Sequence, residues 1–132
     1  MRIGDAADAA GVTPSAVRFY ERRGLLAPPT RTSGGYRDYG PEVIGRLRFI
    51  KAGQRIGLTL AELREVIALR EHGQAPCAHV LELMEERRQQ IASQIDDLRM
   101  LQGELSTLVN RGRELDPADC DPGSVCGVVV PR

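Results

Sequence analysis

The feature that most restricts the fold is a long helical pattern between about Val80 and Arg111. From Ile91, large apolar residues recur in steps of four, three, three, four and three, which is close to a heptad seam. The apolar positions are Met84, Ile91, Ile95, Leu98, Leu101, Leu105 and Leu108. A helix of about 32 residues would be about 48 Å long at 1.5 Å per residue. Because no other segment of the chain is long enough to cover it, its simplest partner is a second copy of itself.

Charge divides the chain into a basic and an acidic half. Residues 1–70 hold twelve Lys/Arg against seven Asp/Glu, whereas residues 71–132 hold six against eleven, so the net charge is zero. This asymmetry indicates two separate roles, and nucleic acid is a partner that suits the basic half. No apolar run reaches the roughly 18 residues that a membrane span needs, and the first residues show no signal-peptide pattern. We therefore expect a cytoplasmic protein with no membrane partner.

The basic half has the spacing of a helix-turn-helix. Ala-rich residues 3–10 predict a first helix that Gly11 ends. Thr13 is a good N-cap and Pro14 a favourable first residue for a second helix, which stops at Gly24. Two short helices joined by a tight turn that contains glycine are typical of a helix-turn-helix.

The segment that follows predicts a wing and two more helices. Gly34 and Gly35 separate two short extended segments, which indicates a hairpin. A third helix is expected from Pro41 to about Ala52, and the pattern of residues 59–62 is a capping box that opens a fourth. We therefore expect a mainly α fold. Its parts are a winged helix-turn-helix DNA-binding domain (1–71), a linker (72–79), a dimerisation coiled-coil helix (80–111) and an effector-binding loop and tail (112–132).

Arginines of the second helix and the wing form a candidate DNA-binding surface. Ser15, Arg18 and Arg22 are three and four residues apart, so they share one helix face that could enter a major groove. The wing adds Arg31 and Arg37 with Tyr36 between them, a set suited to phosphate contacts. Any one of these arginines could be a solvated surface residue. The whole set, placed on a helix-turn-helix and a wing, favours DNA binding.

These motifs resemble those of the MerR-type winged helix-turn-helix family. The matching residues are Val17-Arg18-Phe19-Tyr20-Glu21, Gly24-Leu25-Leu26, Arg31, Gly35-Tyr36-Arg37 and Tyr39, and with the coiled-coil helix the resemblance covers residues 1 to about 111. It implies a homodimeric transcription regulator whose long helices pair antiparallel. Such dimers bind a pseudo-palindromic promoter in which the spacer between the −35 and −10 elements is over-long. The effector-bound form bends and untwists that DNA so that RNA polymerase can read it.

The resemblance also implies roles for single residues by position. Ser15 and Arg18 would face bases or nearby phosphates. The residues it places at the DNA backbone are Tyr20, Arg31, Tyr36 and Arg37. A rival interpretation makes Tyr20 partly a core residue.

The effector that the chain can accommodate is small. Drug-sensing members of the family append a large ligand domain after the coiled coil, and residues 112–132 are too few for one. An ion or a reactive thiol is therefore expected. In a reducing compartment Cys77, Cys120 and Cys126 are thiols or metal ligands rather than a disulfide frame. Cys77 stands just before the long helix, whose N-terminus would favour the thiolate form.

Three thiolates without a fixed fourth ligand suit Hg²⁺, Pb²⁺ or Cd²⁺, whereas Zn²⁺ would want a fourth ligand. The candidates for that ligand are His79, Asp119 and Asp121, although His79 could instead be a polar residue of the helix start. In the family, a cysteine at the position of Cys77 typifies sensors of divalent soft ions. Metal-sensing members also carry a cysteine directly at the end of the coiled-coil helix, and this chain has none near Gly112.

Chain reach predicts that such a metal site joins two subunits. Cys77 and Gly112 would lie at opposite ends of a helix about 48 Å long. The chain from Gly112 to Cys120 spans at most about 28 Å, so Cys120 cannot return to its own Cys77. In an antiparallel dimer, Cys77 of the partner subunit would lie beside Cys120 and Cys126.

Two other functions stay open at this point. One is a thiol-based redox or electrophile sensor of the same fold, in which Cys77 or a Cys120–Cys126 pair reacts. The other is a metal-sequestering protein, for which an arginine-lined helix and wing would have no use. An enzyme is not expected, because no triad, phosphate loop or carboxylate pair is visible.

Overall fold

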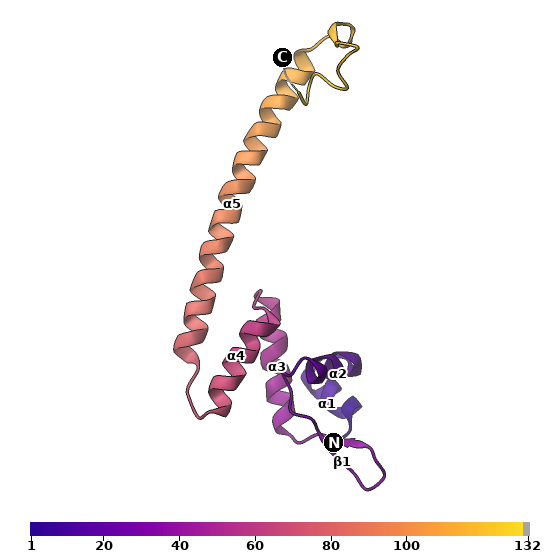
Figure 1. Ribbon diagram of the computed structural model, residues 1–132, viewed down its shortest axis with the longest axis vertical. Coiled ribbons are helices and arrows are strands. Elements are labelled where there is room, and N and C mark those ends of the chain that lie inside the picture. Colours follow the sequence, from indigo (N-terminus) through magenta and orange to yellow (C-terminus); the bar gives the residue numbers. More distant parts are fainter. Residues whose placement is uncertain (131–132) are drawn as a thin grey trace. The chain divides into compact units, whose positions relative to one another are not determined.

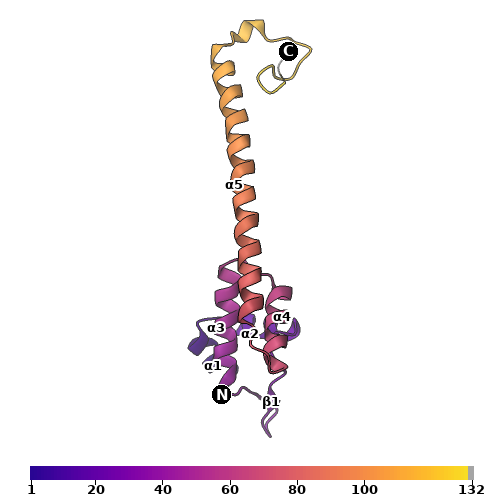
Figure 2. The same cartoon turned by 90° about the vertical axis from the view of Figure 1, so that its left-hand side faces the viewer.

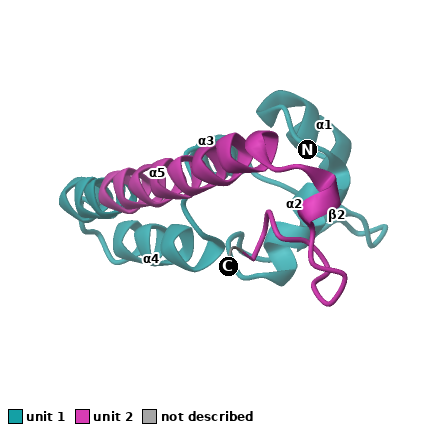
Figure 3. Ribbon diagram, turned by 90° about the horizontal axis from the view of Figure 1, so that it is seen from above, with its two compact units in different colours: residues 1–87 teal, residues 88–132 magenta. Residues whose placement is uncertain are grey.

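The computed structural model describes residues 1–130 and divides into two units, Met1–Arg87 and Arg88–Arg132 (Figure 3). The elements in chain order are α1 (Ile3–Ala10), α2 (Pro14–Arg22), β1 (Thr30–Arg31), β2 (Arg37–Asp38), α3 (Glu42–Arg55), α4 (Leu60–Glu71), α5 (Cys77–Glu114) and the 3₁₀ helix η1 (Pro117–Asp119) (Figure 1). The expected mainly α fold, with a small wing and a long helix after it, is confirmed.

Local hydrogen bonds explain where the short helices begin and end. The Thr13 hydroxyl accepts a hydrogen bond from the Ala16 N–H at 3.1 Å, and Pro14 is the first residue of α2. Gly24 follows α2 with a φ of 77°, a left-handed conformation in which glycine carries no steric penalty. Both halves of the predicted capping box form between Thr59 and Glu62 at the start of α4. Each of these predictions is confirmed.

One apolar core holds the first unit together. Its largest fully buried side chains are Val17, Leu25, Leu47, Ile50 and Leu63. They come from α2, the segment after it, α3 and α4, so the core fixes the position of the helix-turn-helix. Gly53 of α3 is buried against Leu63 of α4, and glycine is required there because a Cβ would overlap the Leu63 side chain.

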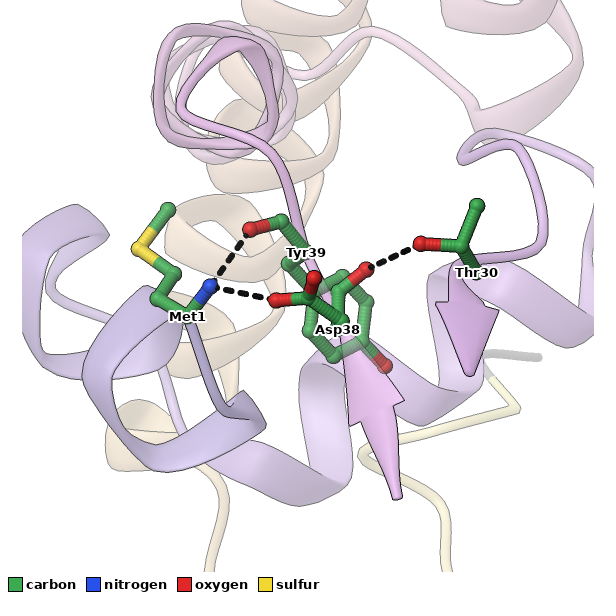
Figure 4. A network of polar contacts seen from close by, with 4 residues as sticks. All are labelled: Met1, Thr30, Asp38 and Tyr39. Carbon is green, nitrogen blue, oxygen red and sulfur yellow. Dashed lines mark hydrogen bonds and ion pairs between the residues drawn. The ribbon is translucent and has the colours of Figure 1, made fainter. Parts of the chain in front are cut away.

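The wing is a two-stranded antiparallel hairpin in which Thr30 pairs with Asp38 and Arg31 with Arg37. Gly35 turns the chain between the strands with a φ of 82°. The Met1 amino group donates to the Asp38 carboxylate at 2.7 Å and to the Tyr39 carbonyl at 2.8 Å (Figure 4). These bonds attach the base of the wing to the residues that precede α1.

Helix α5 is uninterrupted from Cys77 to Glu114, as two views show (Figures 1 and 2). It begins three residues before the expected start at Val80 and ends three residues after Arg111. It starts early because the Pro76 carbonyl accepts a hydrogen bond from the Val80 N–H at 3.0 Å, which closes the first turn. Gly112 does not end it, since a helical glycine costs only about 1 kcal/mol.

The heptad positions of α5 are exposed in the single chain. Ile91, Ile95, Leu98, Leu101 and Leu105 are between 43% and 64% exposed. A continuous stripe of large apolar side chains is unfavourable in water and marks an interaction surface. Among residues 1–130, no helix is long and apolar enough to span a membrane.

Candidate nucleic-acid interface and thiol sites

The exposed face of α2 carries the side chains expected to read DNA. Ser15, Arg18 and Arg22 are all exposed, as their spacing predicts. Within residues 1–130, the Arg18 guanidinium makes no hydrogen bond or ion pair, so its five donors are available to an external acceptor. A planar guanidinium can bind a guanine edge or a phosphate with two parallel hydrogen bonds.

Two of the expected phosphate contacts on the wing already have partners in the protein. Arg31 Nη1 donates to the Gly35 carbonyl at 2.9 Å and braces the turn. Arg37 Nη1 lies 3.5 Å from Glu21 Oε2, which forms an ion pair between the wing and α2. The pairing orients both guanidinium groups, and a phosphate near Arg37 must compete with the Glu21 carboxylate. Tyr36 is 57% exposed.

Tyr20 is positioned differently from the other expected contacts. Its side chain is 8% exposed, and its hydroxyl donates to Gln54 Oε1 of α3 at 2.6 Å. Burial raises the pKa of Tyr20. This placement agrees with the interpretation of Tyr20 as a core residue, because its hydrogen bond joins α2 to α3. A contact between Tyr20 and the DNA backbone stays a prediction.

The structure brings two of the three cysteines to one hollow in the second unit. Cys120 and Cys126 are free thiols that line a cavity of about 620 Å³, together with Asp119 and Asp121. Cys77 is an exposed free thiol at the first residue of α5, in the first unit. Within the described part of one chain, no group of three or more His, Cys, Asp or Glu side chains is arranged to hold a metal.

The turn after Cys126 is built to stabilise a thiolate. Backbone N–H groups of Val128 and Val129 donate to the sulfur and lower the pKa of Cys126. Arg111 Nη2 donates to the Val128 carbonyl at 3.0 Å and to the Gly127 carbonyl at 3.4 Å. The turn that carries the donors is thereby held to the last turns of α5.

Gly112 lies in the place where the family resemblance leads one to expect a cysteine. A Cβ on Gly112 would lie 3.0 Å and 3.1 Å from the two methyl carbons of Val128, which is tighter than ordinary packing. The missing side chain therefore makes room for Val128 beside α5. Sequence patterns gave no sign of this contact or of the Arg111 bonds, because both join residues more than fifteen positions apart.

The candidate fourth ligands differ in their surroundings. His79 Nε2 lies 3.2 Å from Glu65 Oε2 of α4, so it pairs with another residue of the first unit, as a polar residue of the helix start would. Asp121 Oδ1 accepts a hydrogen bond from the Gly123 N–H at 2.9 Å, and Asp119 belongs to η1. Both aspartates line the hollow that holds Cys120 and Cys126.

Comparison with known proteins gives consistent matches. Residues 1–70 match the family described as MerR HTH family regulatory protein, and residues 44–108 match the one described as MerR, DNA binding. The mercuric resistance operon regulatory protein of Bacillus cereus is 36% identical over 111 residues, which cover 84% of each chain. The HTH-type transcriptional regulator CueR of Escherichia coli O6:H1 is 33% identical over 120 residues, which cover 91% of this chain and 89% of that protein.

A solved structure extends the likeness to almost the whole chain. The transcription regulator PbrR691 from Ralstonia metallidurans CH34, in complex with lead(II), has a TM-score of 0.75 at 32% identity. The match covers 98% of this chain and 96% of that one. These relatives are transcription regulators rather than enzymes.

Proposed function

The chain belongs to the MerR family of helix-turn-helix regulators, and from this premise we propose that it is a metal-responsive activator of transcription. It binds promoter DNA as a homodimer and distorts that DNA for RNA polymerase when a divalent heavy metal is bound. The observation that carries the proposal is the presence of two features in one chain. These are an exposed arginine face on α2 and a hollow lined by two free thiols.

In the proposed complex, α2 lies in the major groove and the wing follows the phosphate backbone. Ser15 and Arg18 face bases or nearby phosphates, because both are exposed on one face of α2. The residues assigned to the backbone are Tyr20, Arg31, Tyr36 and Arg37. The buried position of Tyr20 supports a smaller contribution from its side chain than from the three wing residues.

Replacing Arg18 with alanine should weaken binding to the preferred sequence and leave the dimer intact. A lost base contact costs on the order of 1–3 kcal/mol, or about five- to 150-fold in affinity. The measurement is fluorescence anisotropy on DNA selected by the wild-type protein, with Arg70→Ala as a control that removes an exposed arginine of α4. Unchanged affinity and sequence preference in Arg18→Ala would refute the assignment.

The variants Arg31→Ala and Arg37→Ala should weaken binding to every DNA sequence about equally. Each should reduce the slope of log K against log salt by about one, because one phosphate contact is lost. Titrations at several KCl concentrations on selected and unselected duplexes measure both effects. A variant that alters base preference and keeps the salt slope would show that the wing reads bases instead.

The homodimer is proposed from the exposed stripe of α5. The stripe runs along a helix of 38 residues, and no other element among residues 1–130 approaches that length. A second copy offers a stripe of the same length and chemistry. The family resemblance adds that the two helices run antiparallel.

The metal is proposed to bind Cys120 and Cys126 of one protomer and Cys77 of the partner subunit. Thiolates are the ligands that Hg²⁺, Cd²⁺ and Pb²⁺ prefer. Zn²⁺ would add a fourth ligand, for which the candidates are His79, Asp119 and Asp121. The lowered pKa of Cys126 favours the form that binds metal. One relative is named for mercuric resistance and another was solved with lead(II), and both facts support a soft divalent ion.

A titration of the reduced protein tests the proposal. Hg²⁺, Cd²⁺, Pb²⁺ and Zn²⁺ are added in turn, and thiolate-to-metal absorption is recorded in the ultraviolet. We expect at least one ion to give a saturating band that Cys120→Ser removes. If no ion gives a band while all thiols remain titratable, the metal proposal fails.

A redox or electrophile sensor is the second candidate, because Cys120 and Cys126 line the same hollow. In that case a mild oxidant would consume the two thiols together and form a disulfide. Treatment with an oxidant, followed by mass spectrometry of the tail peptide, separates this function from metal binding.

A further inference from the structure

A hollow in the first unit gathers positive charge from three parts of the chain. Its volume is about 390 Å³, and four arginines line it with Tyr36. They are Arg2 before α1, Arg18 on α2, and Arg31 and Arg37 on the wing. Among the described residues that line it there is no carboxylate. Arg37 is paired with Glu21, which is not part of the lining, whereas the other three guanidinium groups have no carboxylate partner among residues 1–130, so an anion in that space would balance their charge.

Arg2 is the member of this group that lies outside the helix-turn-helix and wing motifs. Its guanidinium carbon lies 4.3 Å from the centre of the Tyr36 ring, within the range of a cation–π contact. The Arg2 side chain is exposed, and within residues 1–130 its guanidinium makes no hydrogen bond or ion pair. A guanidinium that stacks on a ring uses its face and keeps its N–H donors, which lie in its plane.

We propose that Arg2 completes a phosphate-binding site on the DNA-facing surface. Its N–H groups bind a phosphate of the DNA backbone, and its stacked face holds the Tyr36 ring in position. The inference rests on the proposed DNA-binding function and adds a residue that neither the helix-turn-helix pattern nor the wing pattern contains.

The two roles of Arg2 can be separated by substitution. Arg2→Ala removes both, so we expect affinity for any duplex to fall by about three- to tenfold and the salt slope to fall by about one. Arg2→Lys keeps the charge and loses the planar stacking group, so it should keep the wild-type salt slope and lose part of the affinity. Arg70→Ala removes the same charge from α4 and should match the wild type.

The measurement is anisotropy of labelled duplexes at several KCl concentrations, with thermal unfolding as a check on each variant. Arg2→Gln is a second neutral variant in case Arg2→Ala does not fold. An Arg2→Ala or Arg2→Gln protein with wild-type affinity and salt slope overturns the inference. So does an Arg70→Ala protein with the same losses, since the effect would then be one of net charge. Failure of the wild-type protein to bind DNA would instead count against the proposed function.

Discussion

Replacing Ile95 and Leu98 together with glutamate is expected to convert the proposed dimer into monomers and to remove tight DNA binding. Each dimer would then contain four carboxylates in place of apolar side chains along the α5 stripe. Removing one large apolar side chain from a packed interface costs about 2–5 kcal/mol, and an unpaired buried charge adds to this. The dissociation constant of the dimer should rise at least about a hundredfold, since every 1.4 kcal/mol is a factor of ten.

Glutamate keeps helix propensity high, so α5 should form in this variant once the chain is folded. The matched control is Gln89→Glu with Ser93→Glu, which adds the same charges at positions outside the stripe. Sedimentation equilibrium gives the assembly state, and anisotropy gives DNA affinity. A variant with glutamate at both stripe positions that remains dimeric would show that the stripe is not the dimer interface.

Complementation between two cysteine variants should restore metal binding that neither variant has alone. One subunit carries Cys77→Ser, and the other carries Cys120→Ser with Cys126→Ser. In each homodimer every proposed site lacks at least one thiolate. The mixed dimer contains one site made only of wild-type cysteines and one site with none. It should therefore bind about one metal ion per dimer with thiolate charge-transfer absorption, since soft ions require the thiolates.

The mixed dimer is made by co-expression with two affinity tags and purified over both. The two homodimers from the same preparation are the controls. A site within one subunit cannot produce this recovery, because neither variant chain owns all three cysteines. If the mixed dimer binds no more metal than its parents, the intersubunit site is refuted, and Cys120 and Cys126 act without Cys77.

The helix boundaries that could be predicted are those fixed by local chemistry. The Thr13 and Thr59 hydroxyls accept hydrogen bonds from N–H groups in the first turns of their own helices, and Pro14 suits a first position where no N–H is needed, so a few adjacent letters predict each start. Likewise, the exposed face of α2 follows from spacing alone. The start of α5 at Cys77 was missed because the determining bond runs from Val80 to a proline carbonyl.

Features that depend on distant residues left no local pattern. The Arg37–Glu21 ion pair and the Tyr20–Gln54 hydrogen bond each join separate elements of the first unit. The Arg2–Tyr36 stack joins residues 34 positions apart. In the tail, backbone N–H groups lower the pKa of Cys126. No residue type in the sequence identifies such a donor, because nearly every residue has a backbone N–H. These contacts require the tertiary structure.

Metal-dependent transcription from a bound promoter is the direct test of the proposed function. The protein selects its promoter from a pool of fragments, and purified RNA polymerase then transcribes it without metal and with each of Hg²⁺, Cd²⁺, Pb²⁺ and Zn²⁺. Promoter occupancy is measured in the same samples. We expect at least one ion to raise transcript yield while occupancy stays constant, and the Cys120→Ser protein to bind the promoter without this response. A promoter that is fully occupied and gives the same yield with and without every ion would contradict the proposed function.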